Sequence, residues 1–206
     1  MANDQGTGLG LFPVEQPYGN IRTHYYRVKT DQALFRFQPV QLDGAGLIIP
    51  AIIGDNRMVL GSIVGFVNNP SKGGLPTEMT ALSHAAYFRA NEGEAWAAVS
   101  DDPNQIYLIE SDTGGGTYPA ATDVGSTAAF TYEATTGSTT TGICTARLDS
   151  SDIAADSGGS LQIVAAGENV NSDGTPNTLG ATTAYSKLLV RISRHQLGPI
   201  GLTALT

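Results

Sequence analysis

Acidic residues stand at both ends of one short segment, Val99 to Asp112, which reads VSDDPNQIYLIESD. Two carboxylates held within a few ångströms on one rigid face can act as acid and base or bind a metal ion. The spacing here argues against such a site. At about 3.3 Å per residue, Asp102 and Asp112 stand at opposite ends of a strand roughly 30 Å long. Asp101, Asp102, Glu110 and Asp112 are therefore expected to face solvent or a basic neighbour.

The same segment has the pattern of a turn followed by a core strand. Asp-Asp-Pro-Asn at 101–104 is typical of a turn, with Asp at its start and Pro inside it. Side chains of the strand that follows alternate between two faces. One face is expected to carry Ile106, Leu108 and Glu110, and the other Tyr107, Ile109 and Ser111.

The stretch NVNSDG at 169–174 resembles the first half of a calcium-binding loop. Asn169, Asn171, Asp173 and Gly174 occupy the first, third, fifth and sixth positions of that loop. The twelfth position, which should supply a bidentate Glu, is Gly180. A polar hairpin loop is the favoured interpretation, and no metal site is predicted.

Three aspartates in LDSSDIAAD have helix-like spacing: Asp149, Asp152 and Asp156. Capping of a short turn by Asp149 or Ser151 explains this pattern better than a cation site does.

Other catalytic patterns are missing from the sequence. His24, His84 and His195 are far apart, and none belongs to an HExxH motif. There is no GxSxG motif and no phosphate-binding loop. His195 is expected to have a hydrogen-bonded structural role. The single cysteine, Cys144, is expected to be a small buried hydrophobe, so no disulfide is predicted. The chain is interpreted as a non-enzyme without a cofactor, made in a reducing cytoplasm.

Composition points to a β-rich protein that is soluble without much charge. Charged residues make up 15% of the 206, against about 25% in typical soluble domains. The 25 glycines favour many turns over long helices. No apolar run reaches the roughly 20 residues that span a bilayer, and no secretory signal is recognised, so no membrane partner is expected.

Charge is unevenly distributed along the chain. Residues 90–186 contain thirteen acids and one base, Arg147, for a formal charge of −12, whereas the remainder has ten bases and six acids, or +4. An acidic central block repels phosphate backbones, so nucleic acid is not an expected partner. The basic flanks could instead meet an acidic protein surface, for example the same block in a neighbouring subunit.

Most of the sequence after the first 22 residues has patterns typical of β-strands. Residues 1–22 lack periodicity and are predicted to form an extended N-terminal arm, with Leu11 and Phe12 as anchors on a partner. Residues 23–206 are predicted to form a β-rich body, with a weak boundary near 68–93 and a helix over 77–90. A basic patch for partner contact is predicted from Arg22, Arg27, Lys29 and Arg36.

About ten short segments read as strands, and they indicate an antiparallel β-sandwich or barrel with at most one or two short helices. They are residues 24–30, 34–42, 46–53, 61–67, 94–100, 105–111, 128–134, 142–148, 160–166 and 186–193.

Several segments in order resemble a family of tailed-bacteriophage virion proteins, the capsid decoration or cement proteins. The resemblance runs from Gly61 to Leu197, and the first 45 residues match less well. It is carried by the order and spacing of GSIVGFV, VSDDPNQIYLIESD, AATDVGS, GSTTTGICTARLDSSD, LQIV and KLLVRISRHQL.

This resemblance implies a β-rich homotrimer on the outer capsid surface, bound to the major capsid protein and stabilising the head without catalysis. Two alternatives stay open. One is another virion part, such as a tail, neck or shell subunit. The other is a carbohydrate-binding β module, in which an exposed Trp or Tyr stacks on a sugar.

Overall fold

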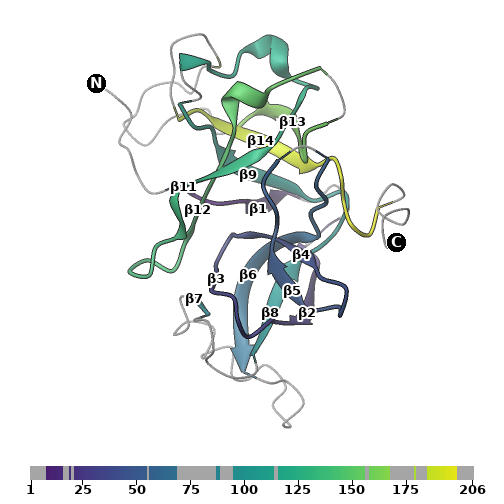
Figure 1. Cartoon of the computed structure of the whole chain (residues 1–206). Helices are drawn as coiled ribbons and strands as arrows, with labels where there is room; N and C mark the ends of the chain where they lie inside the picture. Colours follow the sequence, from purple (N-terminus) through teal and green to yellow (C-terminus); the bar gives the residue numbers. More distant parts are fainter. Residues whose placement is uncertain are drawn as a thin grey trace.

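The fold is mainly β and antiparallel, as the sequence predicts. The computed structural model describes residues 8–15, 19, 21–54, 56–68, 87–88, 95–113, 116–155, 158–167, 179 and 185–198. Two five-stranded sheets lie one above the other in Figure 1 and are called the upper and the lower sheet. Two short 3-10 turns, η4 (Ala121–Asp123) and η5 (Ser150–Asp152), belong to loops.

The upper sheet joins the first described strand to strands from the second half of the chain. Its order is β1 (Phe12–Glu15), β9 (Ile106–Glu110), β14 (Lys187–Ile192), β13 (Leu161–Ala166) and β10 (Thr127–Ala128). A two-stranded ribbon of β11 (Phe130–Gly137) and β12 (Cys144–Leu148) lies beside it.

The lower sheet is built from residues that precede 101. Its order is β2 (Thr23–Arg27), β8 (Ala95–Ser100), β6 (Gly61–Asn68), β4 (Pro39–Leu42) and β5 (Ile48–Pro50). A single bridge between Val28 and Ile48 brings its two outer strands together at one end, but the sheet does not close into a barrel. A second ribbon pairs β3 (Leu34–Phe35) with β7 (Tyr87–Phe88).

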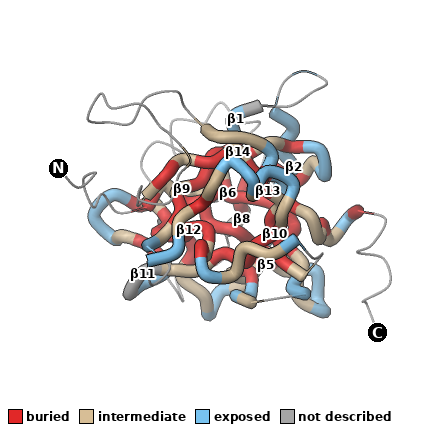
Figure 2. Tube along the Cα trace, turned by 90° about the horizontal axis from the view of Figure 1, so that it is seen from above, coloured by how far each residue is buried: buried red, intermediate tan, exposed pale blue. Residues whose placement is uncertain are grey.

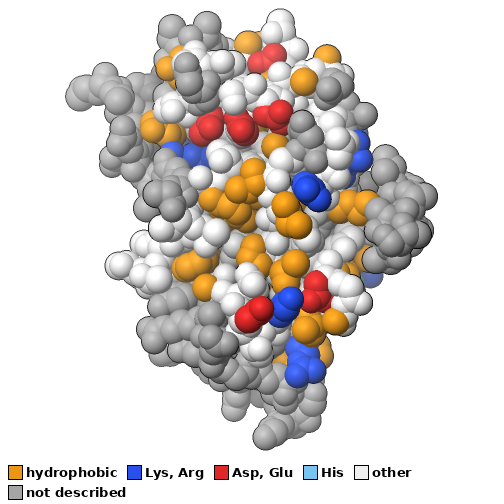
Figure 3. Space-filling view, viewed as in Figure 1, with side chains coloured by type: hydrophobic (Ala, Val, Ile, Leu, Met, Phe, Trp, Pro, Cys, Tyr) orange, Lys and Arg blue, Asp and Glu red, His pale blue; other side chains and the backbone are white. Residues whose placement is uncertain are grey.

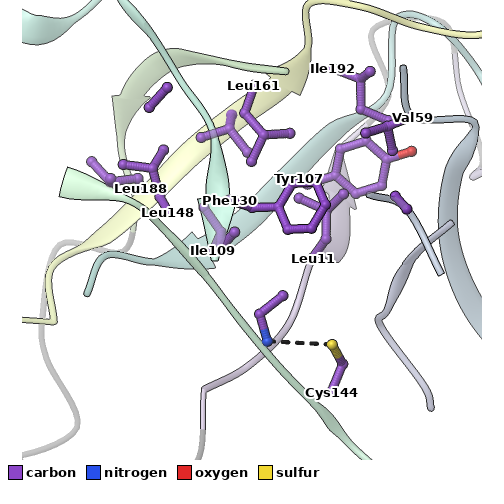
Figure 4. Packing of buried hydrophobic residues seen from close by; sticks show 14 of the residues in the cluster. Leu11, Val59, Tyr107, Ile109, Phe130, Cys144, Leu148, Leu161, Leu188 and Ile192 are labelled. Atoms are coloured by element: carbon purple, nitrogen blue, oxygen red, sulfur yellow. Dashed lines mark hydrogen bonds between the residues drawn. The ribbon is translucent and has the colours of Figure 1, made fainter. Parts of the chain in front are cut away.

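Each sheet covers its own hydrophobic core. The larger core lies against the upper sheet and includes Leu11, Tyr107 and Phe130, all of which are fully buried. Figure 4 shows these three side chains converging from different segments of the chain. The smaller core contains Ile63 and Val99 of the lower sheet. Buried positions run through the middle of the molecule, and exposed positions line its periphery (Figure 2).

Strand β9 confirms the predicted alternation of faces. Tyr107, Ile109 and Ser111 are fully buried, while Ile106 and Glu110 on the opposite face are partly exposed. Leu108, on that same opposite face, is also buried, so the predicted division into two faces is present and both faces pack against other side chains.

Backbone hydrogen bonds at Phe37 tie the two sheets together. The Phe37 N–H donates to the Ile63 carbonyl of β6, and the Phe37 carbonyl accepts from the Leu11 N–H, both at 2.7 Å. Phe37 has a φ of 60°, a left-handed conformation that a bulky residue adopts only when its surroundings enforce it. Phe37, whose backbone is strained, therefore links β6 of the lower sheet to Leu11, the residue just before β1.

The C-terminal segment makes a further tie between the sheets. After leaving β14 it forms a bridge between His195 and Val59. The Gln196 side-chain amide then makes two hydrogen bonds to the backbone of Leu42 in β4. Its Oε1 accepts from the Leu42 N–H at 2.8 Å, and its Nε2 donates to the Leu42 carbonyl at 3.1 Å. The last described residues thus secure the lower sheet to the upper one.

Three sequence predictions need correction. Residues 8–15 of the predicted arm belong to the body, because β1 pairs with β9 and Leu11 lies in the upper core. No boundary separates the sheets at 68–93, since β6 and β8 pair directly with each other. Of the helix predicted over 77–90, the structure describes only Tyr87 and Phe88, and these form a strand.

Candidate functional site

A buried carboxylate marks the point where the chain passes from the lower to the upper sheet. Asp101 follows the last residue of β8, and its side chain is only 2% exposed. Burying a carboxylate is costly unless polar partners satisfy it. Two side chains of the neighbouring strand β2 supply such partners, so three polar groups meet at one corner of the lower sheet.

Both partners, His24 and Tyr26, are two positions apart on β2 and so lie on the same face of this strand. His24 Nδ1 lies 2.8 Å from each carboxylate oxygen of Asp101, and the Tyr26 hydroxyl donates to Oδ2 at 2.5 Å. A carboxylate can only accept hydrogen bonds, so Nδ1 carries the imidazole hydrogen. Burial, followed by the bond to Asp101, raises the pKa of Tyr26 above its ordinary value.

The other edge of the His24 ring faces outward. Nε2 accepts a hydrogen bond from Nη2 of Arg22 at 3.3 Å, and the His24 side chain is 45% exposed. A carboxylate that orients a histidine is common to catalytic and metal-binding sites. Within the described residues, however, no group of three His, Cys, Asp or Glu side chains is placed to hold a metal. The arrangement fixes Arg22 and His24 at the surface of β2.

A second histidine lies on the buried side of Asp101. His195 is 4% exposed, and its Nδ1 accepts from the Leu197 N–H at 3.1 Å. Burial lowers the pKa of His195 below its ordinary value, against the opposing effect of the Asp101 and Asp102 charges. The predicted structural role of His195 is consistent with this geometry.

The predicted basic patch divides into two groups. Arg22 precedes β2, Arg27 is its last residue and Lys29 follows it, with Lys29 Nζ 3.6 Å from Asp43 Oδ2. Arg36 belongs elsewhere, in a segment that bridges Ile143 at the start of β12.

Arg36 instead joins an aromatic pair. Its guanidinium carbon lies 5.1 Å from the centre of the Phe37 ring, and Phe37 contacts Phe12 edge to face at 4.7 Å. Phe12 is 39% exposed. The structure therefore brings together one predicted arm residue and one predicted basic residue, around the strained Phe37.

The two predicted arm anchors have different environments. Phe12 keeps an exposed ring, whereas Leu11 is fully buried within this chain's own upper core. Leu11 cannot be a free anchor for a partner, because its side chain already fills space between the strands. The alternation of side chains along β1 separates these two neighbours.

The acidic segment 99–112 contains the predicted turn, but one of its acids is misjudged. Asp102 Oδ1 accepts from the Asn104 N–H at 2.8 Å, and the Asp102 carbonyl accepts from the Gln105 N–H, so the turn is confirmed. The expectation that Asp101 faces solvent is wrong. The sequence offers no local signal for its bond with His24, since 77 positions separate the two residues.

The remaining acids have structural contacts. Glu110 Oε2 lies 3.7 Å from the buried guanidinium of Arg147, and Asp112 Oδ1 accepts from the Ser150 N–H at 2.9 Å. Asp149 caps η5 by accepting from the Ser151 N–H, as predicted. The calcium-like loop at 169–174, Asp156 and His84 lie outside the described residues.

Cys144 occupies the predicted environment. It is fully buried in the upper core, and burial raises the pKa of its thiol to about 12. A thiol in this state has little of the reactive thiolate at neutral pH.

Apolar side chains also reach the surface. The face in Figure 3 carries hydrophobic side chains across its middle, with acidic side chains gathered above them. A separate shallow hollow of about 390 Å³ is lined by Ala121, Val124, Val164, Ala165, Ala166 and Leu179. Val124 and Val164 are 47% and 38% exposed. Apolar area of this kind often marks a binding surface.

Comparisons with known proteins give no relative. The chain matches no protein-family model, no curated protein and no solved structure. None of the helices that the structure describes is long and apolar enough to cross a membrane.

Proposed function

We propose that the protein is a non-enzymatic structural component of a tailed-bacteriophage virion. In this proposal it is a capsid decoration protein that binds the outer surface of the major capsid protein lattice and stabilises the head. It acts there as a homotrimer and needs no cofactor.

The main support is where the family-like segments fall in the fold. They coincide with β6, the β8–β9 junction, η4, the end of β11 with β12 and η5, β13, and β14 with the C-terminal segment. These elements supply three of the five strands of the upper sheet, β6 and the end of β8 in the lower sheet, and residues in both ties between the sheets. A resemblance that covers the framework supports a shared architecture more strongly than one confined to a loop.

The rigidity of the body and its apolar surface also support a structural role. A protein that resists expansion of a shell needs a body that does not deform and faces that bury apolar area on assembly. The ties at Phe37 and Gln196 supply the first requirement. Repeating a weak contact around a closed trimer on an ordered lattice multiplies its effect through effective concentration.

The test is a binding assay on purified heads of the parent virus from which this protein has been removed. The recombinant protein should restore a stoichiometric layer on the outer surface, visible by cryo-electron microscopy, and light scattering should give a trimer in solution. Mass spectrometry of heads separated from tails distinguishes the alternatives. Recovery of the protein with tails would overturn the decoration role in favour of a tail component.

An exposed aromatic side chain favours the carbohydrate-binding alternative. Tyr25 on β2 is 41% exposed, and an exposed tyrosine can stack on a sugar ring. A glycan array with the wild-type protein and Tyr25→Ala tests this function. Binding that disappears in the variant would support it.

A further inference from the structure

Residues 194–198, here called the C-terminal turn, attach the end of the described chain to the lower sheet. The Gln196 N–H donates to the Val59 carbonyl at 2.9 Å, next to β6, and the Gln196 side chain makes its two hydrogen bonds to Leu42 of β4. The turn lies beyond β14, which ends at Ile192, and its contact with Val59 is an isolated bridge. Opening of this turn would therefore leave the strand pairs of both sheets in place.

The side chain of His195 closes this turn. Its Nδ1 accepts from the Leu197 N–H at 3.1 Å, while the His195 carbonyl accepts from the Gly198 N–H at 3.0 Å. In a neutral imidazole one nitrogen accepts and the other carries the hydrogen, so Nε2 carries it here. The residue is 4% exposed, and its Nε2 is buried. The observed turn therefore depends on the neutral form of His195.

A second proton on His195 is incompatible with this arrangement. The proton would attach to Nδ1, and an imidazolium ring has two donors and no acceptor. The Nδ1–H would then face the Leu197 N–H, and the hydrogen bond that closes the turn would be lost. The charged ring would also be held away from water, which is costly. Both effects favour an open turn whenever His195 is charged.

The groups around His195 offset only part of the cost of charging it. Asp101 and Asp102, in the turn after β8, are the charges that face the ring within the described residues, and the Leu60 backbone next to β6 also contacts it. These groups favour the protonated ring, but burial outweighs them and lowers the pKa of His195 below its ordinary value. The closed turn therefore resists protonation more than a histidine in water does.

We propose that the C-terminal turn is a pH-sensitive device that opens when His195 is protonated. The proton binds Nδ1, the hydrogen bond from the Leu197 N–H breaks, and residues 194–198 leave the lower sheet while both sheets stay folded. The open form then presents the Leu42 N–H and carbonyl, which the Gln196 side chain pairs in the closed form. Acid thus uncovers two backbone groups at the end of β4. The device needs no virion and is independent of the proposed function.

The size of the effect follows from proton linkage. In the open turn the ring is in water, where a histidine has a pKa of about 6.5, whereas the closed turn disfavours the proton. Lowering the pH from 7 to 5 therefore raises the ratio of open to closed turns by up to about twentyfold. We expect a rise of about fivefold or more, because the nearby carboxylates let the closed turn take up some of the proton.

Amide hydrogen exchange tests the proposal, followed by NMR at pH 7 and pH 5 and corrected for the intrinsic exchange rate at each pH. In the wild-type protein the amides of Gln196, Leu197 and Leu42 should exchange about fivefold faster or more at pH 5. His195→Asn is the matched control, because an Asn side chain can accept from the N–H two residues on and does not titrate. The variant should show a rise of less than about twofold. No rise in the wild-type protein, or an equal rise in the variant, would overturn the proposal.

A low concentration of urea distinguishes opening of the turn from unfolding of the whole chain. Core strands exchange through global unfolding, which exposes a large surface, so about 1 M urea at pH 5 should speed exchange in β9 by about fivefold or more. The three amides that report on the turn should change little. Equal acceleration of both would show that acid unfolds the molecule as a whole and would overturn the proposal. This measurement uses the wild-type protein alone, so it decides the matter even where His195→Asn does not fold.

Discussion

The upper and lower sheets each have five described strands, but they differ in the size of the core that they cover and in the strands at their outer edges. Among the described residues, the cluster against the upper sheet has sixteen buried members, and this sheet includes β1, the first described strand, as an outer strand. The smaller cluster, against the lower sheet, has nine such residues, and the outer strands of this sheet, β2 and β5, approach each other at the bridge between Val28 and Ile48. The difference teaches that, within the described residues, the upper sheet buries more apolar side chains and should contribute more hydrophobic stabilisation than the lower one.

The largest expected effect comes from the strand that completes the upper sheet. Leu11→Ala should lower the free energy of unfolding by about 2–5 kcal/mol, because it removes a fully buried side chain from the core. The neighbouring change, Phe12→Ala, is the matched control and should cost less, since its ring is 39% exposed. Urea denaturation measures both. Equal costs would mean that residues 8–15 are not part of the body.

The junction between the sheets should give the next largest effect. Asp101→Ala leaves His24 and Tyr26 without their shared acceptor and should destabilise the fold by about 1–3 kcal/mol. Asp102→Ala, which removes the turn contact to the Asn104 N–H at a partly exposed position, is the control. Calorimetry compares the two melting temperatures. A larger loss for Asp102→Ala would contradict the assigned role of the buried carboxylate.

A smaller effect is expected from the C-terminal tie. Gln196→Ala removes two hydrogen bonds to Leu42 and should cost about 1–2 kcal/mol. Its consequence should be local: amide hydrogen exchange should speed up in β4 and in residues 194–198 and stay unchanged in β9. Uniform acceleration across both sheets would show that Gln196 supports the whole molecule instead.

The smallest effect is a dependence on pH. Burial lowers the folded-state pKa of His195, so the unfolded chain binds a proton more readily than the folded one. The contribution of His195 to folding stability is therefore present above its pKa in the unfolded chain, about 6.5. It is lost as the pH falls through the lower pKa that His195 has in the folded protein. Asp101 and Asp102 are the charges that face this ring and reduce the shift.

The pH effect is tested by chemical denaturation between pH 7 and pH 5. The wild-type protein should lose stability across this range, and His195→Gln should lose less. Parallel curves for the two proteins would assign the pH dependence to other groups, such as the carboxylates, and remove His195 from the account.

Local patterns in the sequence were sufficient for most of the strands and for the turn before β9. Alternation from 105 to 111 predicts the strand β9 and the residues that share each of its faces, and Asp-Asp-Pro-Asn predicts the turn before it. These features depend on neighbours within a few positions, and so a single sequence contains the necessary information.

Features that depend on distant pairing were missed. Residues 8–15 look like an arm because the partner of β1 is β9, more than ninety positions later. The environment of Asp101 has the same origin, since its partner strand β2 begins near residue 23. The charge of Asp101 suggested exposure, but two polar partners satisfy it in the interior. Nothing in the local sequence encodes either contact.

The position of β1 also has a consequence for the order of events during synthesis. All strands of the lower sheet are complete once residue 100 has left the ribosome, whereas β1 can pair only after residues 106–110 have emerged. Domains generally form as units as the chain grows. Among the described strands β1 is synthesised first, and it is expected to pair only after the strands of the lower sheet have emerged, when β9 becomes available.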